Sequence, residues 1–442
     1  MSGSRGSPGG MRIAFNTLGC RLNQFEGDAM RQAAIAAGHE AVAFDQAADV
    51  YVINTCTVTT AADADSRRLV RQAARRNPQA RVIVTGCYAQ VSPAEVAALP
   101  GVGLVLGNAE KAHLVTFLND PGQPGTPRVV VGAIDRARDV ARLPAAHETD
   151  RTRAYLKIQD GCNYQCAFCI VPTARGRNRS VPVGEVLAQA SALWEAGYRE
   201  VTLTGVHLGT YGRDLTPRVS LAGLAAAVVA GARGRVRLSS IDPHEVADDL
   251  LALLAEDRRL CRHLHLPVQS GDETVLRRMR RRHTAEDFRR LVGRAAEAVP
   301  GIGIGADVIV GFPGETEEAF GNTGAMIAAL PISYLHVFTY SRRPGTAAAT
   351  MLDQVPAETK ACRSRALRGL AQRKGIAFRR ALVGRTVEVV VLGRRHRETG
   401  LLEGITDSYV RVLFPGDDGR MGTLAQVRVE EVVPRGTVGQ LV

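Results

Sequence analysis

Short apolar runs alternate with longer amphipathic stretches in the first quarter of the chain. Residues 12–15 form a short apolar strand-like run, and residues 49–54 and 81–85 have the apolar pattern of buried strands. Between them, the spacing of apolar positions over 60–76 predicts a helix that ends at Asn77-Pro78. Buried strands that alternate with helices are typical of a parallel sheet with helices on both faces. We therefore predict an N-terminal α/β domain over residues 11–120.

The same alternation resumes after residues 121–150, whose prolines, glycines and scattered charges indicate a linker. Six strand-like runs then alternate with helical stretches, which is typical of a partial (β/α)6 barrel with its chemistry at the carboxyl ends of the strands. A long basic helix is expected after Pro356, so that this domain covers residues 151–380. The expected strands are 154–159, 200–205, 235–240, 264–266, 303–310 and 335–338.

The pattern changes again after Gly384. Short β-rich runs are separated by turns such as Asp417-Asp418-Gly419, which predicts a small antiparallel, OB-like β-barrel over residues 381–442. Small barrels of this kind often bind RNA. The fold class expected for the whole chain is therefore α/β, with three domains.

Composition adds a location and a class of partner. The 442 residues carry a formal net charge of +12, which favours a polyanionic partner. Basic residues concentrate at 277–282 and 358–398, where they could contact RNA phosphates or could simply form a solvated helix face. Residues 1–10 are polar and Gly/Ser-rich, and we expect a disordered tail. The chain has no signal-peptide core and no apolar run long enough to span a bilayer, so we expect a cytoplasmic protein without membrane contact.

Three cysteines follow the first strand of the predicted barrel. Cys162, Cys166 and Cys169 have the spacing C-x-x-x-C-x-x-C. Three thiolates on one loop can hold three irons of a [4Fe–4S] cluster and leave the fourth iron open for a reactant. The alternatives are a structural zinc site, for which no further ligand pair follows closely, and buried inert thiols. A disulfide framework is disfavoured in a long chain without a secretory signal.

A second set of cysteines lies in the N-terminal domain. Cys20, Cys56 and Cys87 each follow the carboxyl end of a predicted strand. Those ends lie at one edge of a parallel sheet, so the three thiols can meet and hold a second metal cluster. The alternative is that they are inert core thiols. Cys261 and Cys362 fit neither set, and we interpret them as ordinary thiols.

Two cysteine triads followed by a terminal β-barrel resemble the radical S-adenosylmethionine (SAM) methylthiotransferase family, from about residue 11 to residue 440. The resemblance implies an RNA-binding TRAM domain as the C-terminal barrel and two [4Fe–4S] clusters, on Cys20, Cys56 and Cys87 and on Cys162, Cys166 and Cys169. It also implies that SAM bound to the second of these clusters yields a 5′-deoxyadenosyl radical, which removes a hydrogen from C2 of adenine. The cluster of the N-terminal domain presents the sulfur, which a second SAM methylates.

Three branches of this family differ in substrate. Segments 17–24, 54–59 and 205–212 resemble the branch that acts on N6-threonylcarbamoyladenosine at position 37 of tRNA, beside the anticodon. The isopentenyladenosine branch typically has Gln-Asn, and the ribosomal-protein aspartate branch Gln-Asp, where this chain has Val206-His207. The first branch is therefore predicted, with the other two as alternatives. A non-catalytic iron–sulfur RNA-binding protein is the alternative from a different class.

The resemblance also implies further contacts. Thr204-Gly205-Val206 stands where the superfamily often has Gly-Gly-Glu, which leaves side-chain contacts to SAM open there. Tyr164 and Phe168 could shield the cluster or simply pack the loop, and His207 is our hypothesis for a contact to the threonyl carboxylate. The expected partners are the tRNA anticodon stem-loop, through the TRAM domain and the basic helix, and an electron donor such as flavodoxin or ferredoxin. The SAM contacts expected are Tyr164, Phe168, Thr204, Gly205, Ser239, Gln269 and Asp307, and the substrate contacts are Asn23, His207, Arg175 and Arg177.

Overall fold

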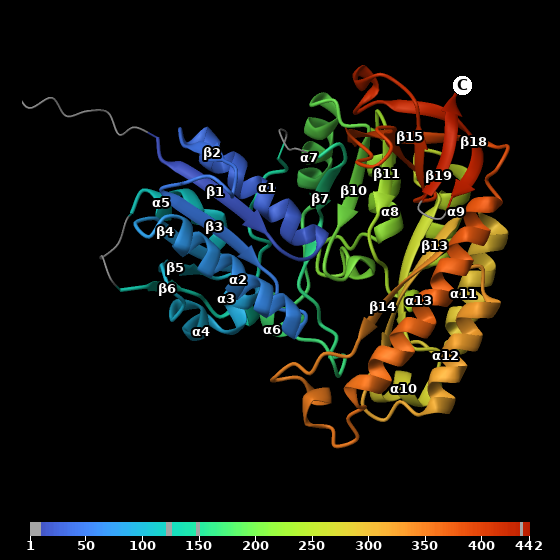
Figure 1. Ribbon diagram of the computed structural model, residues 1–442, viewed down its shortest axis with the longest axis horizontal. Coiled ribbons are helices and arrows are strands. Elements are labelled where there is room, and N and C mark those ends of the chain that lie inside the picture. The colour runs from blue at the N-terminus through green and yellow to red at the C-terminus, as the bar shows by residue number, and fades with distance from the viewer. Residues whose placement is uncertain (1–9, 121–125, 147–150, 434–435) are drawn as a thin grey trace, which may run out of the picture. The chain divides into compact units, whose positions relative to one another are not determined.

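The computed structural model describes residues 10–120, 126–146, 151–433 and 436–442 (Figure 1). Most of the expected tail, and parts of the expected linker, lie outside these residues. The chain divides into two compact units. The first comprises the N-terminal part to Ala146 together with Asp160–Asn163 and Ile170–Arg177, and the second comprises the rest. Among the described residues, no helix combines the length and the apolar character that crossing a bilayer requires.

The first unit is built on a six-stranded parallel sheet in the order β2-β1-β3-β4-β5-β6. Every residue of the central strand β3 is buried, because helices cover both faces of the sheet, which confirms the predicted α/β class. The strands are β1 (Arg12–Thr17), β2 (Glu40–Val42), β3 (Val50–Thr55), β4 (Arg81–Gly86), β5 (Val102–Leu106) and β6 (Arg128–Val130); the helices are α1 (Arg21–Ala36), α2 (Thr60–Arg76), α3 (Cys87–Val91), α4 (Pro93–Ala97) and α5 (Leu114–Leu118), with the 3-10 turns η1 (Glu110–His113) and η2 (Ile134–Arg136).

Strand β6 differs from the sequence-based expectation. It lies within residues 121–150, where we expected a linker, and it pairs in parallel with β5 through Leu106 and Val130. A three-residue edge strand contains too few apolar positions to be recognised among prolines, glycines and charges. The N-terminal sheet therefore extends into the expected linker, and β2, β5 and β6 are strands that the sequence analysis did not predict.

The second unit contains six parallel strands that form the expected partial barrel. They occur as two sheets, β11-β10-β7 and β12-β13-β14, which the hydrogen bond from the Ile241 amide to the His265 carbonyl (3.0 Å) links side by side. The strands are β7 (Ala154–Lys157), β10 (Glu200–Thr204), β11 (Arg235–Leu238), β12 (His263–Gln269), β13 (Gly303–Val310) and β14 (Tyr334–Thr339); the helices are α7 (Val183–Glu195), α8 (Leu221–Ala230), α9 (Asp248–Glu256), α10 (Glu273–Arg278), α11 (Ala285–Ala298), α12 (Glu317–Ala329) and α13 (Ala357–Arg380), with η3 (Leu208–Thr210), η4 (Pro243–Glu245) and η5 (Ala347–Thr350).

The C-terminal strands close into a five-stranded barrel in the order β15-β16-β17-β19-β18. Its neighbours are antiparallel except β17 and β19, which pair in parallel through Leu413 and Val438, so the expected antiparallel barrel has one parallel seam. Val389, Val412, Phe414 and Val427 fill the core and are fully buried. The strands are β15 (Thr386–Arg395), β16 (Leu402–Thr406), β17 (Arg411–Phe414), β18 (Leu424–Val433) and β19 (Gly436–Leu441), with η6 (Asp418–Arg420).

A buried ion-pair network joins this barrel to the partial barrel. Glu200 begins β10 and is fully buried, and it binds Arg235 (2.7 Å), Arg237 (2.9 Å) and Arg153 (3.2 Å). Arg237 also donates to the carbonyls of Thr406 (2.9 Å) and Asp407 (2.8 Å) at the end of β16. Burial would raise the pKa of Glu200, but the guanidinium groups hold it well below its usual range. The C-terminal barrel is therefore joined to strands β10 and β11 of the partial barrel.

Candidate functional site

The three cysteines of the N-terminal unit follow three neighbouring strands. Cys20 precedes α1 after β1, Cys56 directly follows β3, and Cys87 begins α3 after β4. The turn at Gly19 packs on Cys56, because a Cβ atom added to Gly19 would lie 2.9 Å from the Cys56 sulfur. Gly86 has φ +95°, and an added Cβ would lie 2.4 Å from the Thr55 carbonyl oxygen. The fold therefore places the three cysteine turns side by side, at the edge where parallel α/β sheets bind ligands.

The donor set of this triad suits an iron–sulfur cluster. Burial, and to a smaller extent the negative charge of a Cys87 thiolate, raises the pKa of the Cys56 thiol to about 12. Without a metal, Cys56 is therefore a neutral thiol at pH 7. Iron binding must displace its proton, which makes loading of the site easier at higher pH.

In the metal-free chain, Cys56 is expected to react with iodoacetamide at pH 8 at least about 100-fold more slowly than Cys362, because only roughly one thiol in ten thousand is ionised at a pKa near 12. Cys362 is the control because it is exposed on α13. Mass spectrometry of the alkylated peptides measures both rates. Equal rates would show that Cys56 is not shielded.

Arg175 places a buried cation beside the triad. It ends α6 (Val171–Arg175), and its side chain is 2% exposed. Its guanidinium donates to Glu26 (2.7 Å), to Asp160 (3.3 Å), to Asn23 and, through Nε, to the Cys87 sulfur (3.4 Å). Burial would lower the pKa of Arg175, but Glu26 and the Cys87 thiolate hold it well above its usual range. A permanent positive charge therefore faces the sulfur of Cys87.

Two of the predicted substrate contacts, Asn23 and Arg175, thus lie together at the cysteine triad. Sequence reasoning missed their partner Glu26, which also binds the buried Lys111 at 2.6 Å. The signal available in the sequence was weak: Glu26 and Lys111 look like ordinary surface charges. Arg177, the other arginine expected to contact substrate, is exposed.

An Arg175→Gln variant is expected to lose about 3–5 kcal/mol of unfolding free energy, because it removes a buried cation that pairs with the buried carboxylates of Glu26 and Asp160. Arg177→Gln removes the same charge from an exposed neighbour and should change stability by less than about 0.5 kcal/mol. Urea unfolding of both metal-free variants makes the comparison. Similar losses in the two variants would mean that the buried network is not stabilising.

The second cysteine set occupies the loop between β8 (Gln159–Asp160) and α6. All three of its thiols are partly exposed, as a centre that meets a diffusible reactant requires. In the first unit, the Cys162 amide donates to the Gly176 carbonyl (3.0 Å). In the second unit, the Cys169 amide donates to the Cys166 carbonyl (3.0 Å) and the Ala167 amide to the Met279 carbonyl (2.9 Å). Backbone hydrogen bonds thus fix the Cys162 end of the loop within the first unit and the part from Cys166 to Cys169 within the second.

Four of the predicted SAM contacts lie at the carboxyl ends of barrel strands. Ser239 Oγ and Gln269 Oε1 are buried and have no hydrogen-bond partner among the described residues, so both are available to a ligand. Gly205 follows β10, and a side chain there would meet Gln159 Oε1 at 2.7 Å. Thr204 is the last residue of β10 and is buried. These placements fit a ligand bound at this mouth of the barrel.

Two other predicted contacts have protein partners of their own. Phe168 packs against an apolar cluster that includes Phe312 and Tyr340. Asp307 binds His265 (2.9 Å) and His336 (3.1 Å) inside the barrel. Burial would raise the pKa of Asp307, but the two imidazoles hold it below its usual range. Asp307 therefore remains an anion in the barrel.

Tyr164 and His207 meet at a glutamate that sequence reasoning missed. The Tyr164 hydroxyl donates to Glu245 Oε1 (2.9 Å), and His207 Nε2 lies 2.7 Å from Glu245 Oε2. The rings of Tyr164 and His207 are 4.3 Å apart, edge to face. Arg213 also pairs with Glu245 at 3.1 Å. The cysteine loop and the segment after β10 are thus joined through one buried carboxylate.

Comparison with known proteins adds the family. Residues 156–327 match the family model of the radical SAM superfamily, and residues 12–107 match that of uncharacterized protein family UPF0004. The chain is 41% identical, over 94% of its length and 93% of the relative's, to the threonylcarbamoyladenosine tRNA methylthiotransferase MtaB of Bacillus subtilis (strain 168). It is 34% identical, over 98% of its length and 97% of the relative's, to the ribosomal protein uS12 methylthiotransferase RimO of Roseiflexus sp. (strain RS-1).

A solved structure supports the fold. The radical SAM methyltransferase TsrM from Kitasatospora setae, with cobalamin and a [4Fe–4S] cluster bound, aligns over 77% of each chain with a TM-score of 0.55 and 17% identity. Likeness at this identity shows a common architecture. The sequence relatives, which match nearly full length at more than 30% identity, show more: this chain belongs to the radical SAM methylthiotransferase family.

Proposed function

We propose that this chain adds a methylthio group to C2 of N6-threonylcarbamoyladenosine at position 37 of tRNA. The observation that carries the reaction type is the pair of cysteine triads on one chain, one at the sheet edge of the N-terminal unit and one on the loop before α6. The branch is supported by 41% identity to a relative named for this nucleoside, against 34% to the one named for ribosomal protein uS12.

The two triads have separate roles in this proposal. The family uses SAM and [4Fe–4S] clusters, and SAM bound at a cluster supplies a carbon radical that can break an aromatic C–H bond without acid–base help. Cys162, Cys166 and Cys169 provide the thiolates for that cluster. Cys20, Cys56 and Cys87 provide those of the cluster that presents sulfur. Each set of three thiolates would leave one iron of a [4Fe–4S] cluster without a protein ligand.

The protein residues bind and orient the reactants. Ser239 Oγ and Gln269 Oε1 are unpaired among the described residues and can bind the polar groups of SAM. Glu245 holds Tyr164 of the cysteine loop beside His207 of the segment after β10. Arg175 balances the negative charge of the thiolates around Cys87.

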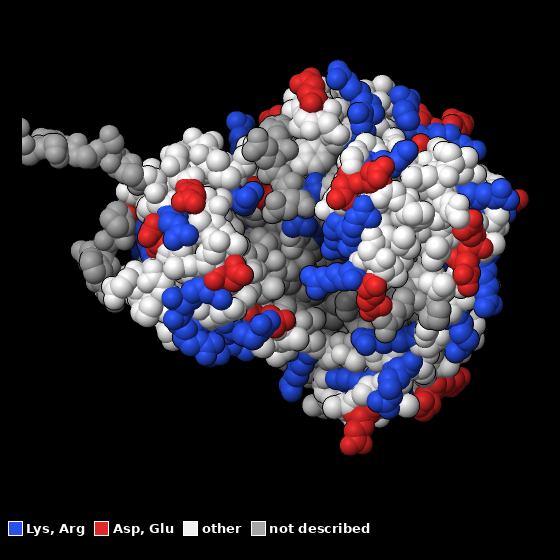
Figure 2. Space-filling model, turned by 45° about the horizontal axis from the view of Figure 1, so that its top comes forward, with Lys and Arg blue, Asp and Glu red and all other residues white. Residues whose placement is uncertain are grey.

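The RNA contacts in this proposal come from α13 and the C-terminal barrel. Exposed arginines lie along α13, whereas Arg363 of the same helix is buried and pairs with Glu315 at 2.7 Å. Figure 2 shows basic side chains spread over the visible face with acidic ones between them, so charge alone does not outline the path of the RNA. The exposed α13 arginines are Arg365, Arg368, Arg373 and Arg380.

The proposal also includes an electron donor such as flavodoxin or ferredoxin and a cytoplasmic location.

The experiment is mass spectrometry of tRNA nucleosides from a strain that lacks the gene, complemented with the wild-type chain or with Cys166→Ala. The wild-type chain should restore the 2-methylthio form of threonylcarbamoyladenosine, and Cys166→Ala should not. Isopentenyladenosine derivatives and the mass of ribosomal protein uS12 should stay unchanged. Restoration of either of those modifications instead would assign the chain to another branch.

A further inference from the structure

The basic run at residues 277–282 is not a uniform surface patch. Arg277, Arg280 and Arg282 are exposed, whereas the side chain of Arg281 is only 6% exposed. Helix α10 ends at Arg278, and Arg280 has a left-handed backbone with φ 59°. That conformation is unfavourable for a residue with a side chain and persists only where its surroundings hold it. The resulting turn directs Arg281 inward.

Three residues of this turn, Met279, Arg281 and Arg282, contact the cysteine loop. Met279 accepts the hydrogen bond from Ala167. Arg281 Nη1 lies 3.6 Å from the sulfur of Cys166. The guanidinium of Arg282 lies over the ring of Tyr164, with its Cζ atom 3.8 Å from the ring centroid. Arg281 is therefore held against a thiol that belongs to the triad on the loop.

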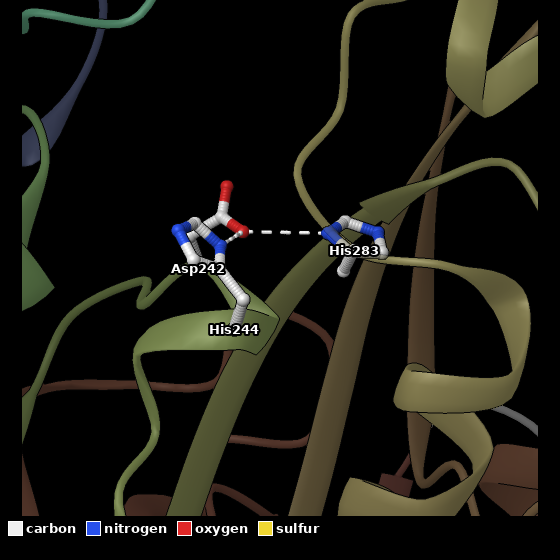
Figure 3. Close-up of side chains that lie close together, drawn as sticks. All are labelled: Asp242, His244 and His283. Carbon is white, nitrogen blue, oxygen red and sulfur yellow. Dashed lines mark hydrogen bonds and ion pairs between the residues drawn. The ribbon is translucent and has the colours of Figure 1, made fainter.

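Asp242 fixes the other side of the Arg281 guanidinium. Arg281 Nη2 donates to Asp242 Oδ2 (2.5 Å) and to the Pro267 carbonyl (2.8 Å). Figure 3 shows the Asp242 carboxylate between two imidazoles: Oδ1 lies 2.7 Å from His244 Nδ1 and 3.4 Å from His283 Nδ1. Burial would raise the pKa of Asp242, but these histidines and Arg281 hold it below its usual range. A constant anion thus orients Arg281.

Asp242, His244 and His283 have donor atoms close enough together to hold a metal ion. Such an ion would share the Asp242 carboxylate with the guanidinium of Arg281, and two cations so close would repel each other. The Tyr164 hydroxyl lies 2.9 Å from His244 Nε2, which ties this histidine to the loop as well. The arrangement is therefore better explained as an anchor for Arg281.

We propose that Arg281 is a positioning residue that raises the reduction potential of the cluster held by Cys166, because it donates an N–H to the Cys166 thiolate. Reduction adds negative charge to the cluster, and a fixed cation with a hydrogen bond to a ligating sulfur stabilises the reduced state. Arginine suits this role because it stays charged at every physiological pH and its fork can contact sulfur and carboxylate at once. The inference rests on the cluster assignment made in the proposed function.

The test is an EPR-monitored redox titration of the reconstituted full chain, without SAM and without tRNA. Arg281→Gln should lower the midpoint potential of this cluster. Arg281→Lys should give an intermediate value, since lysine keeps the charge but cannot bridge both partners. Arg277→Gln removes the same charge from the exposed face of α10 and should leave the potential unchanged. A chain with Cys20, Cys56 and Cys87 replaced by alanine identifies which signal belongs to which cluster.

An unchanged potential in Arg281→Gln would overturn the proposal, and so would a change in SAM affinity alone. If Arg281→Gln fails to retain iron, the comparison of Arg281→Lys with the wild type decides by the same criterion. Substrate identity does not enter this measurement. A chain that fails to modify tRNA but still shows the potential shift would refute the proposed function and leave this inference standing. The cluster on Cys162, Cys166 and Cys169 should still give an EPR signal when Cys20, Cys56 and Cys87 are replaced by alanine. If that variant gave no signal, the cluster assignment itself would be refuted.

Discussion

A Cys87→Ala variant is expected to lose all methylthiolation of tRNA while it continues to cleave SAM. Cys87 supplies one of three thiols at the sheet edge, and a cluster left with two thiolates is not retained. The cysteine loop before α6 is untouched, so radical formation does not require Cys87. Iron content should fall from about eight to about four atoms per chain.

Iron analysis, release of 5′-deoxyadenosine and nucleoside mass spectrometry measure the three quantities on one preparation. Cys362→Ala is the matched control, because it removes an exposed thiol from α13. It should behave as wild type in all three assays. Retained methylthiolation in Cys87→Ala would remove this cysteine from the sulfur-presenting site, and loss of SAM cleavage as well would mean that the two sites are not separable.

A Glu200→Gln variant is expected to lose about 3–5 kcal/mol of unfolding free energy. Glu200 is fully buried among Arg153, Arg235 and Arg237, and a neutral side chain would leave three guanidinium groups to repel one another. The same change loosens the C-terminal barrel, because Glu200 orients Arg237 toward the carbonyl oxygens at the end of β16. RNA binding should weaken as well.

The pH dependence of this effect has a definite sign. The pKa of Glu200 lies well below its usual range in the fold, so its contribution to stability is fully present above the unfolded-state pKa, about 4.5. It is lost only as the pH falls through the lowered folded-state pKa. The difference between the wild type and Glu200→Gln should therefore be constant from pH 6 to 8 and shrink in acid.

Urea unfolding with Glu388→Gln as control tests this prediction. Glu388 also pairs with Arg235, but at 3.8 Å and with a side chain that is 43% exposed, so its loss should cost less than about 0.5 kcal/mol. Equal losses from Glu200→Gln and Glu388→Gln would show that the buried network does not stabilise the contact between the two barrels.

The order of domains and both cysteine triads could be predicted from the sequence. The signals for them, strand periodicity and the position of each cysteine relative to a strand or to the next cysteine, lie within short segments of the chain. The positions of Cys20, Cys56 and Cys87 after strand ends also predict that they lie at one edge of the sheet. The parallel pairing of β17 with β19 could not be predicted, since it depends on how distant strands close a barrel.

The charged residues that pair with the site residues could not be predicted from the sequence. Arg175 and Glu26 are far apart in the sequence, and no local pattern marks them as a buried pair. Glu245, which joins Tyr164 to His207, lies in a short 3-10 turn without a distinctive motif. Residues 277–282 suggested phosphate contacts, yet the left-handed turn at Arg280 directs Arg281 toward Cys166. Composition reports how many charges a segment has, and only the fold decides which of them are buried.

The most direct test of the central claim is a reconstituted reaction with the full chain, SAM, a low-potential reductant and tRNA that carries threonylcarbamoyladenosine at position 37. Mass spectrometry of the digested tRNA should show the 2-methylthio derivative of that nucleoside, together with 5′-deoxyadenosine. A matched tRNA that carries isopentenyladenosine should remain unmodified. Methylthiolation of the isopentenyladenosine tRNA alone, or SAM cleavage without any sulfur transfer, would contradict the account.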